Sequence, residues 1–249
     1  MEEDGRDDTM TRVGISLIMA VLIVIGCRSG RAELEPYRVV ELDAAIAEPS
    51  DICLFPDGAS WLIVSDKGAL FQTDLDGSIK RRAPFHGGDF EGVYAHQKKI
   101  YVAEERARLV HRFDSDSLER EKTYLVPYGG KRNSGYESIV FNRARGVFLL
   151  ITEKDPVLVF EMNGDFQVLK RFPLDVATDI SAATWHEGFL WLVSDEERAV
   201  LKLDPLSYQV LHQWEVPSVR KPEGIAFVGE AMVLVCDAER RLYYFAAPR

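Results

Sequence analysis

Acidic side chains recur along the sequence in two kinds of position that could together bind a cation. The first kind follows an aromatic residue or proline and precedes a small residue; its members are Glu91, Glu137 and Glu223. The second kind ends a run of apolar residues; its members are Glu105, Glu153 and Asp237. Carboxylate oxygens at variable spacing suit Ca²⁺, which accepts about six to eight oxygens in a flexible geometry. We therefore predict these acids as metal ligands.

The two positions keep a nearly fixed distance from each other, and the pair is repeated along the chain. Two weaker copies carry Ser50 with Asp66 and Ser181 with Asp195, which makes five copies in all. The acids that end the apolar runs are separated by 39, 48, 42 and 42 residues. Such a period, with several short strands per repeat, is typical of β-propeller blades, which bury their apolar faces by stacking in a ring. The sequence therefore predicts an all-β, five-bladed β-propeller.

Each repeat is expected to contribute four strands. They are predicted near residues 92–95, 99–104, 108–113 and 118–125 in the second repeat, and near 181–185, 189–194, 199–203 and 208–214 in the fourth. The fifth repeat stops after a third strand near residues 240–245. Residues 37–43 alternate like a strand and precede the first repeat, so we expect them to pair with the last blade and close the ring. Closure would bring the N-terminal tether to the outer rim of the fifth blade.

Propeller geometry brings the two kinds of acid together. The first strand of a blade lines the axis and the second returns beside it, so the start of one and the end of the other share a face. The predicted pairs around one mouth are Glu91 with Glu105, Glu137 with Glu153, and Glu223 with Asp237. Lys67, Arg106 and Lys154 directly follow acids and could compensate part of the charge without a metal. Alternatively, Asp66 and Asp195 brace turns by accepting backbone hydrogen bonds.

The N-terminus carries an apolar segment outside the repeat. Residues 13–26 end at Cys27 and are fewer than the about 20 that a transmembrane helix needs, as in the core of a secretory signal. The end of this run, Val24-Ile25-Gly26-Cys27, resembles the bacterial lipobox, whose cysteine is acylated. We expect residues 1–27 to be a lipoprotein signal peptide or membrane anchor helix with lipidation at Cys27. Residues 28–36 would be a tether and residues 37–249 the propeller.

Composition and motifs exclude several other functions. The chain has 249 residues and a net charge of −10, and it lacks the basic stripe that nucleic-acid binding needs. It contains no nucleophile elbow, zinc-binding helix or phosphate loop.

The five histidines are scattered, and the tryptophans are expected to pack between blades. Cys53 and Cys236 fall on blades that closure makes neighbours, and buried free thiols are favoured over a disulfide.

The motifs resemble those of the SdiA-regulated domain family over nearly all of residues 37–249. The resemblance is carried by Gly88-Asp89-Phe90-Glu91-Gly92, Gly135-Tyr136-Glu137, Glu153-Lys154-Asp155-Pro156, Asp179-Ile180-Ser181, Ser194-Asp195-Glu196 and Pro222-Glu223-Gly224-Ile225-Ala226. It implies an exported bacterial five-bladed propeller with calcium in its funnel and a distant likeness to the esterase-like domain of phytases. The implied ligands are Glu91, Glu137 and Glu223, with Glu105, Glu153 and Asp237 as further candidates. Ser138 and Ala182 depart from this pattern, where glycine is usual.

Two classes of function remain open at this point. The first is a membrane-tethered protein of the cell envelope whose acidic, calcium-binding funnel holds a small-molecule or protein ligand. The second is a calcium-dependent hydrolase of phosphoesters, other esters or lactones, in which a funnel carboxylate would act as base. Glu104 and Glu196 are spare acids, but no histidine lies near the acidic motifs in the sequence. The sequence therefore favours binding and leaves catalysis undecided.

Overall fold

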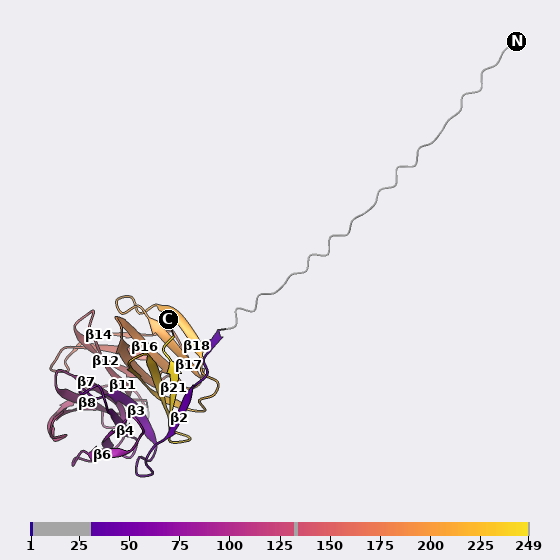
Figure 1. Cartoon of the computed structure of the whole chain (residues 1–249). Helices are drawn as coiled ribbons and strands as arrows, with labels where there is room; N and C mark the ends of the chain where they lie inside the picture. The colour runs from indigo at the N-terminus through magenta and orange to yellow at the C-terminus, as the bar shows by residue number, and fades with distance from the viewer. Residues whose placement is uncertain (2–30, 132–133, 249) are drawn as a thin grey trace. The chain divides into compact units, whose positions relative to one another are not determined.

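The described part of the chain folds into five β-sheets arranged in a ring (Figure 1). The computed structural model describes residue 1, residues 31–131 and residues 134–248. Within these residues there are 21 strands and no helix, and hence no helix that could cross a membrane. The signal or anchor helix expected over residues 1–27, with Cys27, lies outside the described residues apart from residue 1.

Blades 1 to 4 each contain four consecutive antiparallel strands. Blade 1 comprises β3 (Pro49–Leu54), β4 (Trp61–Ser65), β5 (Ala69–Thr73) and β6 (Ile79–Arg82). Blade 2 comprises β7 (Phe90–His96), β8 (Lys99–Glu104), β9 (Leu109–Asp114) and β10 (Arg120–Leu125). Blade 3 comprises β11 (Tyr136–Asn142), β12 (Val147–Thr152), β13 (Leu158–Met162) and β14 (Val168–Pro173). Blade 4 comprises β15 (Ala182–His186), β16 (Phe189–Ser194), β17 (Ala199–Leu203) and β18 (Val210–Glu215). The five-bladed propeller predicted from the repeat is confirmed.

Blade 5 is assembled from both ends of the propeller. Its strands β19 (Pro222–Val228), β20 (Ala231–Cys236) and β21 (Arg241–Ala246) are completed by β2 (Arg38–Glu41). Figure 1 shows the indigo β2 beside the yellow β21, and the two are antiparallel with Val39 opposite Tyr243. Because β2 covers the outer edge of β21, the predicted closure by an N-terminal strand is confirmed.

A short strand before β2 was not predicted. Strand β1 (Ala32–Glu33) runs parallel to β18, with Ala32 opposite Trp214. The Leu34 N–H extends this pairing by donating to the Glu215 carbonyl at 2.8 Å. Part of the expected tether, residues 28–36, therefore pairs with the outer edge of blade 4 before the chain reaches β2 at the outer edge of blade 5. Two paired residues are too few to show an alternating pattern in the sequence.

Apolar side chains fill the space between neighbouring blades. The largest fully buried ones include Trp61, Phe90, Phe113, Tyr136 and Phe160. Each buried side chain of this size stabilises the fold by about 1.5–3 kcal/mol, so the ring depends on contacts between sheets. Three of the four tryptophans are buried here as expected, and Cys53 and Cys236 are free buried thiols.

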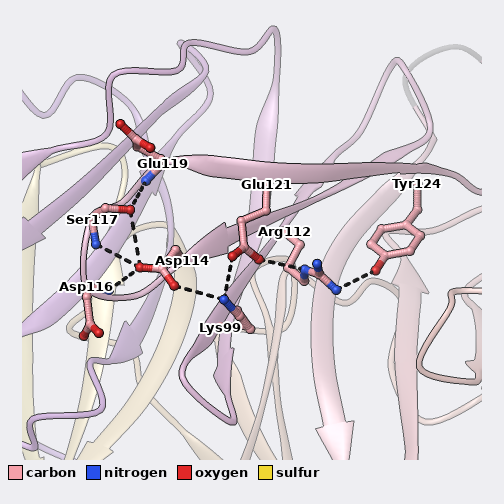
Figure 2. A network of polar contacts seen from close by, with 8 residues as sticks. All are labelled: Lys99, Arg112, Asp114, Asp116, Ser117, Glu119, Glu121 and Tyr124. Atoms are coloured by element: carbon pink, nitrogen blue, oxygen red, sulfur yellow. Dashed lines mark hydrogen bonds and ion pairs between the residues drawn. The ribbon is translucent and has the colours of Figure 1, made fainter.

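A network of polar side chains braces the exposed outer half of blade 2 (Figure 2). Lys99 Nζ lies 2.9 Å from Asp114 Oδ2 and 2.6 Å from Glu121 Oε1. Arg112 donates to the other Glu121 oxygen at 3.0 Å and to the Tyr124 hydroxyl at 3.2 Å. The hydrogen bond from Lys99 lowers the pKa of Asp114 to about 2 and also lowers the pKa of Glu121. We call these five side chains the blade-2 network; each of its charges has an opposite partner.

Candidate metal centre

A cavity of about 310 Å³ lies on the axis where the inner strands of the five blades begin. Every blade supplies acids or short polar side chains to it. The acids are Glu48, Asp66, Glu91, Glu137, Glu153, Asp179, Asp195, Glu196, Glu223 and Asp237. We call this cavity the acidic cup. Five of the six predicted ligands line it: Glu91, Glu137, Glu153, Glu223 and Asp237.

β-bulges aim the first set of acids into the cup. The pairing register of the inner strand shifts at Glu91 in β7, at Glu137 in β11 and at Glu223 in β19. The register also shifts at Ser50 in β3. A bulged residue has no partner of its own in the ladder, so its side chain can turn out of the sheet. Each predicted inner acid is therefore the extra residue of its strand.

Glycine beside a bulge lets neighbouring inner strands approach closely. A Cβ atom on Gly92 would lie 2.8 Å from the Ile139 nitrogen and 3.0 Å from the Ser138 Cα. A Cβ atom on Gly224 would lie 2.8 Å from the Ile52 nitrogen. These contacts involve backbone atoms that cannot swing away, so only glycine fits without a shift. The small residue that follows the acid thus serves the close packing of strands at the axis.

Backbone hydrogen bonds join the second set of acids to the starts of the inner strands. The Glu105 N–H donates to the Asp89 carbonyl at 2.9 Å, and the Asp237 N–H donates to the Lys221 carbonyl at 3.3 Å. In both blades the end of the second strand therefore lies beside the start of the first, as the repeat predicted.

Glu105 lies behind the wall of the cup, unlike the other predicted ligands. Its side chain is buried, and its Oε1 accepts a hydrogen bond from the Gly135 N–H at 2.8 Å. It also lies against the Asp89 carboxyl group. Its carboxylate fixes the segment that leads into blade 3 and adds negative charge next to the cup.

Lysines neutralise one side of the cup. Lys221 Nζ lies 2.7 Å from Glu223 Oε1 and 2.6 Å from Asp237 Oδ2. Lys154 Nζ lies 2.9 Å from Glu153 Oε1. Lys154 was predicted to compensate charge, whereas Lys221 was missed because it precedes its motif and no other repeat has a lysine there.

Asp89 is the buried acid that the sequence did not single out. Its residue is 2% exposed, and within the described residues neither carboxylate oxygen accepts a hydrogen bond. Arg106 Nε forms an ion pair with Oδ2 at 3.0 Å. Asp66, Asp89 and Glu91 each offer an oxygen, and these oxygens lie within 4.8 Å of one another. Calcium–oxygen distances of about 2.3–2.6 Å fit a cation between them.

The inner glutamates are held in a form that resists ionisation. Burial and then the neighbouring acids raise the pKa of Glu91 and of Glu137 well above the usual range. Burial raises the pKa of Glu223 to about 7, although Lys221 opposes the shift. Among the described residues, neither Glu91 nor Glu137 has an ion-pair partner. A cation in the cup would restore their charged forms.

In blade 4 the turn after the second strand is braced by Asp179 and not by Asp195, for which this structural role was the alternative. The Asp179 carboxylate accepts the N–H of Asp195 at 3.0 Å and that of Glu196 at 3.3 Å, and it contacts the Ser194 hydroxyl. Asp195 itself lines the cup, where burial and the charge of Asp179 raise its pKa. Asp195 is thus available to the cavity.

His111 lies on strand β9 and is engaged inside blade 2. It is 1% exposed, and its ring nitrogens lie 2.7 Å from Glu104 Oε2 and 2.9 Å from Thr123 Oγ1. Glu104, one of the two spare acids, is therefore engaged inside blade 2 and does not line the cup. The alternation of β9 places His111 on a buried face, a signal that could have identified it.

Comparisons with known proteins agree with this architecture. The crystal structure of Myxococcus xanthus glutaminyl cyclase is similar with a TM-score of 0.67 and 15% identity, over 86% of this chain and 96% of that chain. A streptogramin B lyase structure has a TM-score of 0.49 and 13% identity, over 85% and 73% of the two chains. The similarity to the glutaminyl cyclase is a similarity of fold. The sequence model of the SdiA-regulated family matches residues 37–246, and the chain belongs to that family.

Proposed function

We propose that the acidic cup binds Ca²⁺ and that the loaded cup holds a ligand or partner at the cell envelope. The observation that carries this proposal is the cluster of Asp66, Asp89 and Glu91, in which both Asp89 oxygens are buried without a hydrogen bond. Buried polar atoms in native proteins nearly always have a partner, and a bound ion is one such partner. Arg106 already forms an ion pair with Asp89 Oδ2, and a cation among the three carboxylates would also give Oδ1 a partner.

The donor set favours calcium over a transition metal. Carboxylates dominate the lining, which contains no histidine or cysteine among the described residues. Hard oxygen donors select Ca²⁺ or Mg²⁺, and side chains from separate blades suit the larger and more flexible coordination sphere of Ca²⁺. Glu137 and Glu223 face the same cavity and could add further oxygens.

Calorimetry tests the metal site directly. All five sheets close within residues 31–248, so the propeller unit 31–249 can be titrated with CaCl₂ after treatment with a chelator. We expect saturable binding that Asp89→Asn and the double variant Glu91→Gln/Glu223→Gln both abolish. Glu121→Gln in the blade-2 network removes an exposed carboxylate that is paired within its own blade, and it should leave the binding heat unchanged. Equal heats in all these proteins would refute the site.

The membrane tether is proposed from the sequence around Cys27. Acylation there, with more than one chain, would hold the propeller at a membrane surface durably. Cells that express the full chain should incorporate alkyne-labelled palmitate into it, and Cys27→Ser should lose the label. Cys53→Ser is the matched control because Cys53 is a buried thiol in blade 1. Labelling that persists in Cys27→Ser would rule out this tether.

A second candidate function is calcium-dependent hydrolysis, and Glu137 is the residue that favours it. Its carboxyl group lines the cup, has a raised pKa and has no ion-pair partner in the described residues. A carboxyl group whose pKa is raised holds its proton more strongly and can donate it to a reacting group, while bound calcium would polarise the scissile bond. Phosphate esters and lactones should be screened with and without Ca²⁺. Turnover that Glu137→Gln abolishes while calcium still binds would support catalysis; its absence would leave binding as the function.

A further inference from the structure

A second cavity of about 620 Å³ lies at the other end of the inner strands. It is formed where the first strand of each blade turns back toward the second. Aromatic and basic side chains from all five blades line it, namely Phe55, Tyr94, Arg143, Trp185 and Phe227. We call it the hairpin cavity. Its size falls in the range of about 300–1,000 Å³ that is usual for small-molecule sites.

The hairpin cavity is separate from the acidic cup. The two cavities share no lining residue. Between them the inner strands pass through apolar residues that are at most 2% exposed: Ile52, Val93, Ile139, Ala183 and Ile225. A ligand in one cavity therefore has no direct contact with the other, and variants of the two can be tested independently.

Two stacked ring pairs give the hairpin cavity fixed walls. His96 stacks on Phe141 with ring centroids 3.9 Å apart and an interplanar angle of 26°. His186 stacks on Phe227 at 3.9 Å and 2°. Burial lowers the pKa of both histidines, so both rings are neutral at pH 7. The walls thus present flat, uncharged rings to an incoming molecule.

Tight hairpins hold these histidines in place. In each hairpin, two residues with positive φ follow the histidine before the next strand begins. In blade 2 they are Gln97 (48°) and Lys98 (58°), and in blade 4 they are Glu187 (47°) and Gly188 (87°). Two-residue turns of this kind match the twist of the strands that they join. The cavity is therefore largely formed before a ligand arrives, which lowers the entropic cost of binding.

The charge of the hairpin cavity is opposite to that of the acidic cup. Arg143 and Lys98 line it, and Glu187 is the single acid among the lining residues that the structure describes. Arg143 is exposed and lies against the hydroxyl group of the buried Tyr94. A guanidinium group presents two parallel N–H donors that match a carboxylate.

We propose that the hairpin cavity binds a small organic anion of the aromatic carboxylate class. The carboxylate pairs with Arg143, and the flat ring contacts the aromatic lining that includes Trp185 and Phe55. A neutral ring compound would keep only the apolar contacts. A phosphate without a ring would keep only the ion pair. The cavity therefore selects molecules that carry both groups.

Saturation-transfer NMR on the propeller unit tests this proposal with 2-naphthoate and indole-3-acetate and their neutral amides. We expect the carboxylates to bind at least about tenfold more tightly than the amides. Arg143→Gln should remove this preference and leave amide binding unchanged. Trp185→Ala should weaken carboxylates and amides alike. Glu91→Gln in the acidic cup should leave all four affinities unchanged.

Tryptophan fluorescence supplies a second readout. Trp185 is half-buried at the cavity, whereas the other three tryptophans are buried elsewhere in the described structure. Binding should change the emission of the wild-type protein, and Trp185→Phe should lose that change. Arg143 is exposed, so Arg143→Gln should keep the wild-type melting temperature. The proposal is overturned if no carboxylate binds, if Arg143→Gln binds carboxylates like the wild type, or if Glu91→Gln abolishes binding.

Discussion

The acidic cup and the blade-2 network use the same kind of side chain in opposite ways. In the network, Lys99 lies between Asp114 and Glu121, and the pKa of each acid is lowered. In the cup, burial and neighbouring acids raise the pKa of Glu91 and Glu137, and the described protein offers neither of them a cation. The charges of the network are paired within the chain, whereas Glu91 and Glu137 have no ion-pair partner among the described residues.

This difference separates structural from functional use of charge. Exposed ion pairs such as those of the network are screened by solvent, so they adjust stability only slightly. Buried carboxylates without counter-charges destabilise a fold, and strongly perturbed acids cluster at functional sites for that reason. The five blades have similar architecture, so the contrast arises from where each acid sits within a blade.

Calcium should give the largest effect. At a free concentration one hundred times the dissociation constant, binding stabilises the folded state by about 2.7 kcal/mol. For a chain of this size this corresponds to a rise in melting temperature of about 5–10 °C. Differential scanning calorimetry should show this rise for the wild type and for Glu121→Gln, and its loss for Asp89→Asn. An equal rise in all three would mean that calcium acts outside the cup.

Without metal, the two regions should respond to pH in opposite directions. The pKa of Glu223 is about 7 in the folded state and 4.5 ordinarily, so between these values the folded state binds more protons than the unfolded state. The free energy of unfolding should therefore fall as pH rises through 7, by about 1–3 kcal/mol between pH 5 and 8. The pKa of Asp114 is about 2, below its ordinary 3.8, so its stabilising contribution is lost only as pH falls through this lower range.

Urea denaturation in a chelating buffer at several pH values measures this dependence. Glu223→Gln should flatten the decline, because the variant has no carboxyl group to titrate at that position. A wild-type protein that is equally stable at pH 5 and pH 8 would contradict the raised pKa of the cup acids.

Single amide substitutions should give the smallest effects, with opposite signs. In metal-free protein at pH 8, Glu137→Gln removes a repelled carboxylate and should raise the free energy of unfolding by about 0.5–1 kcal/mol. Glu121→Gln removes a paired, exposed carboxylate and should lower it slightly. Urea denaturation resolves both changes. A loss of stability in Glu137→Gln as large as that in Glu121→Gln would show that Glu137 is internally paired.

The fold could be predicted because its information is repeated five times. In each copy, a similar number of residues separates the start of the inner strand from the end of the second strand. The period therefore stays visible even where the sequence of one copy differs from the others. The closing strand could be predicted because the fifth repeat has only three strands and needs a fourth from elsewhere in the chain. Strand β1 could not be found in this way, because it belongs to no repeat and only two of its residues pair.

The candidate site was predictable only where it follows the repeat. Glu91, Glu137 and Glu223 share one position in the motif and all line the cup. Asp89 occupies the place just before the motif, where the corresponding residues are Glu48, Gly135, Asp179 and Lys221. Three of these five positions are acidic, but Gly135 and Lys221 interrupt the series, so Asp89 was quoted within a motif without being predicted as a ligand. Only the tertiary structure shows what Asp89 and Lys221 contact.

The β-bulges at the starts of the inner strands also affect how the lining of the acidic cup can change in evolution. Flanking residues carry the ladder hydrogen bonds, so the inserted residue can be exchanged without unpairing the strand. Blade 1 already shows such an exchange, with Ser50 at the bulge where three other blades carry glutamate. Exchange of a single bulged residue would thus change the lining of the cup in one blade while the strands that support it stay the same.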